Sequence, residues 1–166
     1  MIRDAHRRDI LALAKMTVDT RNAAYVPLLP EGQKDVFYVQ NTVDHVRAVL
    51  RSKMKDRNYV FYVEETEGLL RGYIIANPQT GAIPFIFVNH EEQGNGIGRA
   101  LFEYLTEVTS SPAYYVVVLK DNVSACRFYC SRGFVKSGVK NKKYLGLERI
   151  IMEWTRPSNG RAQMRV

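Results

Sequence analysis

The sequence predicts an α+β protein with a central mixed, mostly antiparallel sheet of about seven strands flanked by about four helices. Segments with a helical period alternate with segments rich in aromatic and β-branched residues, in the order β-α-α-β-β-β-α-β-α-β-β. Three of these strands follow one another without a helix, which argues against a doubly wound dinucleotide fold. The length of 166 residues suits one domain, which we expect over residues 1–155.

The N-terminal third predicts one short strand and two helices. Residues 1–5 suit the strand, and the first helix is expected to end near Arg21. Residues 25–33 contain two prolines and a glycine and predict a loop. Thr42 is expected to cap the second helix. The apolar side chains of the two helices recur at helical spacing at Ile10, Leu13, Ala14 and Thr17, and at Val43, Val46, Leu50 and Met54.

Three consecutive strands are expected next. Residues 58–65 and 69–78 flank the sequence TEG and predict a hairpin. Residues 81–88 predict the third strand, and Pro84 within it indicates an edge, a bulge or irregular pairing, because proline cannot donate a backbone hydrogen bond.

The C-terminal half predicts two helices and three strands. An apolar stripe predicts a helix over residues 97–109, and the apolar run 113–119 predicts a strand buried on both faces. Residues 122–132 predict a short helix that Gly133 closes. Residues 134–139 and 149–154 predict the last two strands, and residues 156–166 a flexible basic tail.

The composition limits the class of protein and its surroundings. No apolar run approaches the ~20 residues of a membrane span, and the charged N-terminus does not resemble a signal peptide. Cys126 and Cys130 predict free thiols, so we expect a cytoplasmic protein. No histidine cluster accompanies them, so we expect no metal site.

The net charge is +7, and lysines crowd one late segment at Lys136, Lys140, Lys142 and Lys143. A solvated basic face is one interpretation. Attraction of a polyanionic cofactor or an acidic partner is the other, and charge alone does not decide between them.

The sequence QGNGIG, residues 93–98, leads directly into a predicted helix. Glycines at a helix N-terminus predict a phosphate site, because backbone N–H groups and the helix dipole both favour an anion. The spacing differs from the G-x-G-x-x-G of dinucleotide sites, and no Lys-Ser or Lys-Thr follows Gly98, as a nucleoside triphosphate loop requires. A tight turn without a ligand is the remaining simple alternative.

Two motifs resemble the GNAT family of N-acetyltransferases. Gln93, Gly96 and Gly98 match its Q/R-x-x-G-x-G/A loop. The second motif, N-x-x-A-x-x-x-Y-x-x-x-G-F, is matched by Asn122, Ala125, Tyr129, Gly133 and Phe134. The motifs have the family's order and are separated by one predicted helix and one strand. The resemblance extends over residues 1–155.

This resemblance implies acetyl-CoA as the cofactor and a small-molecule or peptide amine as the acceptor. The pantetheine arm is then expected along Ile86, Phe87 and Val88, with the N–H of Val88 as the oxyanion donor. The pyrophosphate is expected on the loop from Gln93 through Gly94, Asn95, Gly96, Ile97, Gly98 and Arg99. Asn122 and Tyr129 are expected to contact the cofactor, and Tyr129 is the expected proton donor to the leaving thiolate.

The acceptor and the general base are less determined. Val117 occupies the place where ribosomal-protein acetyltransferases carry a glutamate, so the base stays unassigned, although Glu64, Glu65 and Asp121 are available carboxylates. Tyr25 and Tyr144 are expected to line the acceptor entrance, or else to be packed surface aromatics. The hairpin lysines favour an acceptor that carries a carboxylate or a phosphate.

Three alternatives remain at this level. The chain is an acetyltransferase, a noncatalytic CoA-binding module of the same fold, or an acyltransferase that uses a longer acyl donor or a hydroxyl acceptor. No membrane or nucleic-acid partner is expected, and a homodimer is left open.

Overall fold

A computed structural model describes residues 1–158 and confirms the predicted fold class. Seven strands form one sheet in the order β1-β2-β3-β4-β5-β7-β6, and every neighbouring pair is antiparallel except β4 and β5. The strands are β1 (Ile2–Asp4), β2 (Val60–Thr66), β3 (Leu69–Asn77), β4 (Ala82–Val88), β5 (Ala113–Leu119), β6 (Val135–Tyr144) and β7 (Leu147–Thr155).

Five α-helices accompany the sheet, one more than expected. They are α1 (Ile10–Tyr25), α2 (Lys34–Gln40), α3 (Val43–Lys55), α4 (Ile97–Val108) and α5 (Val123–Ser131). The additional helix, α2, buries only Phe37, while Val36, Tyr38 and Val39 are exposed. Such a short helix has no apolar stripe from which it could be predicted. Short 3-10 helices lie at Arg7–Asp9, Val26–Leu28, Glu31–Gln33 and His90–Glu92.

Several predicted helix and strand ends are confirmed. Thr42 caps α3 by accepting a hydrogen bond from the N–H of His45 at 3.2 Å. Gly133 follows α5 with a φ of 90°, as a C-terminal glycine does. The turn between β2 and β3 lies at Glu67 and Gly68, both with positive φ. The first helix is longer than expected and ends at Tyr25 instead of near Arg21.

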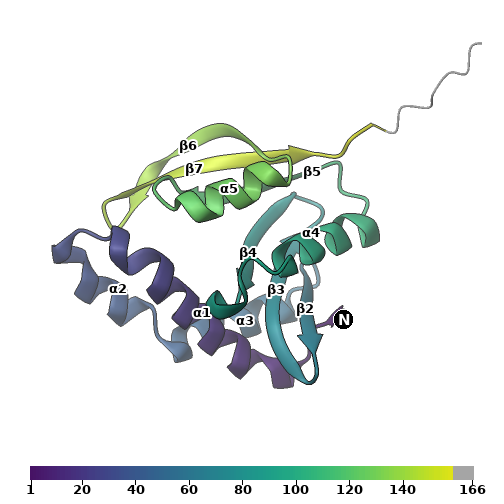
Figure 1. Ribbon diagram of the computed structural model, residues 1–166, viewed down its shortest axis with the longest axis horizontal. Coiled ribbons are helices and arrows are strands. Elements are labelled where there is room, and N and C mark those ends of the chain that lie inside the picture. The colour runs from purple at the N-terminus through teal and green to yellow at the C-terminus, as the bar shows by residue number, and fades with distance from the viewer. Residues whose placement is uncertain (159–166) are drawn as a thin grey trace, which may run out of the picture.

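The helices cover both faces of the sheet (Figure 1). On one face, α4 and α5 pack over a core that includes Leu101, Phe102 and Trp154. On the other face, α1 and α3 pack over a core that includes Leu13, Leu50 and Tyr73. None of the helices within residues 1–158 is both long and apolar enough to cross a bilayer.

Strands β4 and β5 meet at one end and then separate. Ala82 and Tyr115 are their one registered pair in the described chain, and the N–H of Tyr115 donates to the carbonyl of Gly81 at 2.8 Å. A bulge follows at once, because Ile83 and Pro84 together oppose Ala76 of β3. Irregular pairing at Pro84 is therefore confirmed, since bulges bend a strand and end its regular pairing.

The two ends of the described chain are held by arginines. Arg156 donates to the carbonyls of Thr106, Thr109 and Ser111 at 2.8–3.1 Å, so the ordered chain continues into the segment expected to be a tail. Residues 159–166, the rest of that segment, lie outside the described residues.

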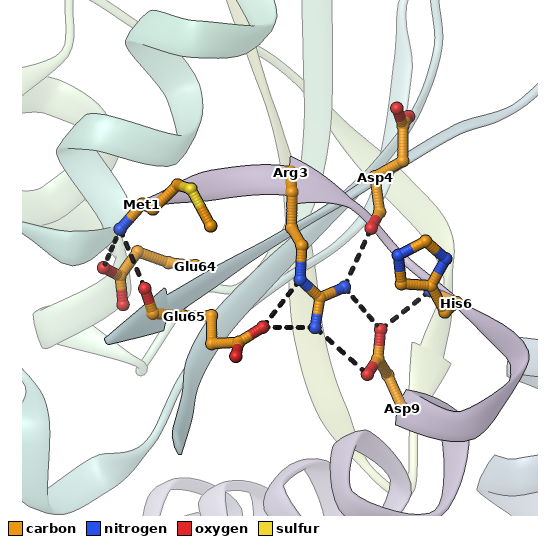
Figure 2. Close-up of polar contacts among 7 residues, drawn as sticks. All are labelled: Met1, Arg3, Asp4, His6, Asp9, Glu64 and Glu65. Atoms are coloured by element: carbon orange, nitrogen blue, oxygen red, sulfur yellow. Dashed lines mark hydrogen bonds and ion pairs between the residues drawn. The ribbon is translucent and has the colours of Figure 1, made fainter. Parts of the chain in front are cut away.

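Near the N-terminus, Arg3 joins β1, β2 and the first turn (Figure 2). Its guanidinium donates to Asp9 at 2.8 Å and to Glu65 at 2.6 Å. The N–H of His6 donates to the same Asp9 carboxylate at 2.7 Å. Burial by itself raises the pKa of Asp9, but the hydrogen bonds from Arg3 and His6 outweigh it and hold that pKa below its usual value.

We expect Asp9→Asn to lower the free energy of unfolding by about 1–3 kcal/mol at neutral pH, because the Arg3 guanidinium loses its charged acceptor. Because the pKa of Asp9 is lower in the folded protein, its ionised carboxylate stabilises the fold at pH values above the unfolded pKa of ~3.9. This stabilisation is lost as pH falls through the lower pKa of the folded state. In urea titrations across that acidic range, the free energies of unfolding of the native protein and of Asp9→Asn should therefore converge as pH falls. Asp44→Asn, at a 93% exposed side chain, is the control; a difference independent of pH would contradict the assignment.

Gly81→Ala should lower the free energy of unfolding by about 1–3 kcal/mol. Gly81 has a φ of 77°, and an added Cβ would lie 2.7 Å from the carbonyl oxygen of Ala113. The junction between β4 and β5 would have to shift. Gly32→Ala, where no atom lies within 4 Å of the added Cβ, is the control in the same urea titration. Equal stability of the two variants would show that this junction is not constrained.

Candidate active site

A cavity of about 430 Å³ lies where β4 and β5 separate. The end of α1, strand β4, the loop before α4, strand β5 and helix α5 all contribute to its walls. Most residues expected at the site line this cavity: Tyr25, Ile86, Phe87, Val88, Gln93, Gly94, Gly96, Ile97, Gly98, Arg99, Asn122 and Tyr129. Segments that are distant in sequence thus meet at one place.

Two expected residues do not line the cavity. The amide nitrogen of Asn95 lies 3.5 Å from the Glu92 carboxylate. Tyr144 instead contacts the ring of Tyr25 edge-on, with ring centroids 6.3 Å apart. Tyr25 also packs on Phe37. The structure therefore brings the two tyrosines together, with Tyr25 in the wall and Tyr144 beside it.

The glycine-rich loop presents the N-terminus of α4 to the cavity. Gly94 and Gly96 have φ values of 86° and 80°, a conformation that favours glycine. The N–H of Ala100 makes the first intrahelical bond, to the carbonyl of Gly96. In the described chain no side chain caps this helix, so its first N–H groups remain available to an anion.

Gly98 serves a different purpose from the other two glycines. A Cβ at this position would lie 3.1 Å from the ring of Phe128. Gly98 therefore permits the close packing of α4 against α5, which holds the two motifs side by side. The sequence motif alone did not distinguish this packing role from phosphate binding.

The backbone of β4 faces the cavity at alternate residues. The N–H of Asn89 donates to the carbonyl of Arg71 on β3 at 2.9 Å, and Val88 lies opposite Gly72. Since backbone groups alternate between the two edges of an antiparallel strand, those of Ile86 and Val88 point away from β3. The carbonyl of Val88 accepts from Thr20 and Gln93 at 3.3 and 3.4 Å.

Tyr129 projects from α5 into the cavity wall. Asn122 caps α5 as expected, by accepting from the N–H of Ala125 at 3.2 Å. The Tyr129 ring makes edge contacts with Phe128 and Phe134. Burial raises the pKa of Tyr129, and Tyr25 and Cys126 raise it further. The phenol therefore stays protonated at neutral pH.

Two arginines lie in the wall near the glycine loop. Arg99 bonds Glu103 at 2.7 Å, and Arg132 approaches the same carboxylate at 3.6 Å. Arg132 was not predicted, although it directly precedes Gly133 of the second motif. Both arginines place positive charge beside the free N–H groups of α4.

Carboxylates are scarce at the cavity. Glu92 is the acidic residue of its wall within the described chain, and it pairs with Arg71 at 3.3 Å. Glu64 instead contacts the amino group of Met1, and Glu65 contacts Arg3 (Figure 2). Neither glutamate lines the cavity. Val117, in the place of the glutamate of some relatives, is 38% exposed. Its exposure also corrects the expected burial of β5 on both faces.

Comparison with known protein families identifies the family of this chain. A family model described as Acetyltransferase (GNAT) domain matches residues 29–156. The chain belongs to the GNAT acetyltransferase family. This membership confirms the resemblance carried by the two motifs and makes the protein an acetyltransferase by family.

Individual relatives of this GNAT chain agree. It is 31% identical over 120 residues to "5-NmdU N-acetyltransferase" of Pseudomonas phage PaMx11, covering 66% of this chain and 85% of the relative. The fold resembles that of the paia N-acetyltransferase from Thermoplasma acidophilum in complex with coenzyme A, with a TM-score of 0.77, 14% identity and coverage of 94% and 98%.

A further GNAT neighbour is yncA from Salmonella typhimurium with its cofactor acetyl-CoA, with a TM-score of 0.65, 17% identity and coverage of 93% and 92%. At these identities the solved structures show the fold alone. The CoA and acetyl-CoA bound in these structures agree with acetyl-CoA as the expected cofactor of this GNAT chain. No group of His, Cys, Asp and Glu in residues 1–158 is arranged to hold a metal ion.

We expect Gly96→Ala to weaken CoA binding by about tenfold or more, since a Cβ strains the positive φ that aims the α4 N–H groups. Calorimetric titration with CoA measures the loss. Gly68→Ala is the matched control, because Gly68 has a φ of 78° and open space around it but lies in the β2–β3 turn. Both variants should lose similar stability, about 1–2 kcal/mol. Equal CoA affinity for both would contradict the role of this loop.

Proposed function

We propose that this GNAT protein transfers an acetyl group from acetyl-CoA to a primary amine by direct attack in a ternary complex. One observation carries the proposal. A single cavity is lined by the glycine loop at one end, the exposed edge of β4 along its length, and both Tyr129 and Tyr25. An anion site, a strand edge and a phenol are the three features that such a reaction needs in one place.

The cavity walls suit acetyl-CoA. The N–H groups of α4 together with Arg99 and Arg132 would bind the pyrophosphate, since dipoles and cations both favour it. The backbone groups of Ile86 and Val88 would pair with the amides of an extended chain laid along β4. Acetyl-CoA, when bound, supplies the acetyl group as a thioester.

The acceptor nitrogen would form a bond to the thioester carbonyl carbon as the carbon–sulfur bond breaks. The N–H of Val88 points to the edge where the carbonyl oxygen would gather charge, and it is the proposed oxyanion donor. Tyr129 would give its proton to the sulfur. With Glu92 paired to Arg71, the proton of the acceptor nitrogen would leave to water or to a carboxylate of the substrate.

A nitrogen acceptor is supported by the phage relative, which is named an N-acetyltransferase. The substrate in that name, 5-NmdU, is that of the phage protein and is not assigned to this chain. We also propose a cytoplasmic location, which agrees with the free thiols of Cys126 and Cys130 in the described chain.

Tyr129→Phe should lower kcat for amine acetylation by about 100-fold or more, the usual contribution of a positioned proton donor. CoA affinity should change little, because the ring is retained. Thiol release from acetyl-CoA against a panel of amines measures the effect. Since the pKa of Tyr129 is raised, kcat of the native protein should show no decline from phenol ionisation below pH ~10.

Tyr38→Phe, at an exposed tyrosine of α2, is the control and should keep full activity. If the native protein binds CoA but releases no thiol with any amine, the enzymatic proposal fails in favour of a noncatalytic CoA-binding module. If longer acyl-CoAs are preferred as donors, the acetyl assignment fails.

A further inference from the structure

Arg21 of α1 carries a positive charge that nothing in the described chain neutralises. Its Nε is buried and has no hydrogen-bond partner, and no carboxylate in residues 1–158 lies within 4.0 Å of its guanidinium. Arg21 is half-buried as a residue. A buried polar atom without a partner is costly, so its Nε points to a water, an ion or a ligand that completes the site.

The other partly buried arginines of the chain differ from Arg21. Arg3 bonds Asp9 and Glu65, and Arg156 bonds three backbone carbonyls. The Nε of Arg71 also lacks a hydrogen-bond partner, but its guanidinium has a carboxylate, that of Glu92, at 3.3 Å. Each of these cations has a carboxylate or backbone acceptor that the fold itself supplies, whereas Arg21 lies against the Phe85 and Phe87 rings with only the uncharged Tyr25 hydroxyl as an acceptor.

The surroundings of Arg21 place it beside the cavity on the face opposite α4. Its guanidinium lies 5.4 Å from the centre of the Phe87 ring and 5.8 Å from that of Phe85. Phe87 lines the cavity, and so does Tyr25, one helical turn along α1. Arg21 is close enough to Tyr25 and Tyr144 to lower the pKa of each, against the larger effect of burial, which raises both.

This face is the acceptor side of the proposed reaction. The glycine loop and α4 pack on the other face of the sheet, whereas Phe85 and Phe87 belong to the core under α1 and α3. An acceptor that reaches the thioester from the α1 side would pass Tyr25 and Tyr144. Strand β6, which ends at Tyr144, adds the exposed lysines Lys136, Lys140, Lys142 and Lys143 and carries no acidic residue.

We propose that Arg21 binds an oxyanion of the acceptor, so that the preferred substrate is an amine carrying a carboxylate or a phosphate. The guanidinium would donate two hydrogen bonds to either group. Phe85 and Phe87 hold its plane in place, and Tyr25 and Tyr144 shield it from water. This inference rests on the proposed acetyl transfer for its meaning as substrate selection, but the binding preference can be measured without turnover.

The test compares matched amines that differ in one anionic group. β-Alanine is paired with propylamine, and phosphoethanolamine with ethanolamine, so the two pairs separate a carboxylate from a phosphate preference. In the thiol-release assay, at least one anionic amine should exceed its neutral partner in kcat/KM by about tenfold or more, the effect of one charge-assisted hydrogen bond.

Arg21→Met should abolish this preference and leave kcat/KM for the neutral amines within about threefold, because the methionine retains apolar packing on the rings. Arg21→Lys should keep part of it. Arg51→Met removes one positive charge from an exposed position of α3 and should keep all of it. A native protein without the preference, or a preference that survives Arg21→Met, overturns the inference.

Calorimetric titration of the CoA-saturated protein with the same four amines separates this inference from the proposed function. If no amine releases thiol but an anionic amine binds at least about tenfold more tightly than its neutral partner, and Arg21→Met removes the difference, the inference holds and the acetyl transfer fails. If neither anionic amine binds in this titration, the inference is overturned.

Discussion

The site depends on a parallel strand pair that is allowed to form at one end only. β4 and β5 share the pair Ala82–Tyr115, next to the bond from Tyr115 to Gly81. The bulge at Pro84 then bends β4 away from its neighbour. From this separation follow the cavity, the lack of a β5 partner for the Val88 backbone and the exposure of Val117. If β4 and β5 were paired along their whole length, the cavity would be closed and both the Val88 backbone and Val117 would be covered.

The arginines of the chain divide into those that hold the fold and those that lie in or beside the cavity wall. Arg3 and Arg156 tie the two ends of the described chain to its body through acceptors that the fold supplies. Arg99 and Arg132 share one glutamate beside the glycine-rich loop. Arg21 has a buried Nε without a hydrogen-bond partner and no carboxylate acceptor in residues 1–158. The more deeply a cation is buried, the more it needs an acceptor to offset its lost hydration. This difference separates the structural arginines from Arg21, the proposed binding residue.

The chemistry is supported by rigid elements more than by loops. Tyr129 is held on α5 between Phe128 and Phe134, and α5 is in turn held against α4 because Gly98 has no Cβ. The same packing that aligns the two motifs also buries part of Tyr129 and thereby raises its pKa. Position and protonation state of the proposed donor therefore have one physical origin.

The sequence alone determined the fold class, the glycine-rich loop and the two family motifs, because periodicity, glycine spacing and caps such as Asn122 are local properties of the chain. It missed α2, whose single buried residue leaves no pattern, and it missed Arg132. It also could not single out Arg21 from the chain's many other basic residues. Only the tertiary structure decided which charges find partners and where β4 leaves β5, since both depend on contacts between residues distant in sequence.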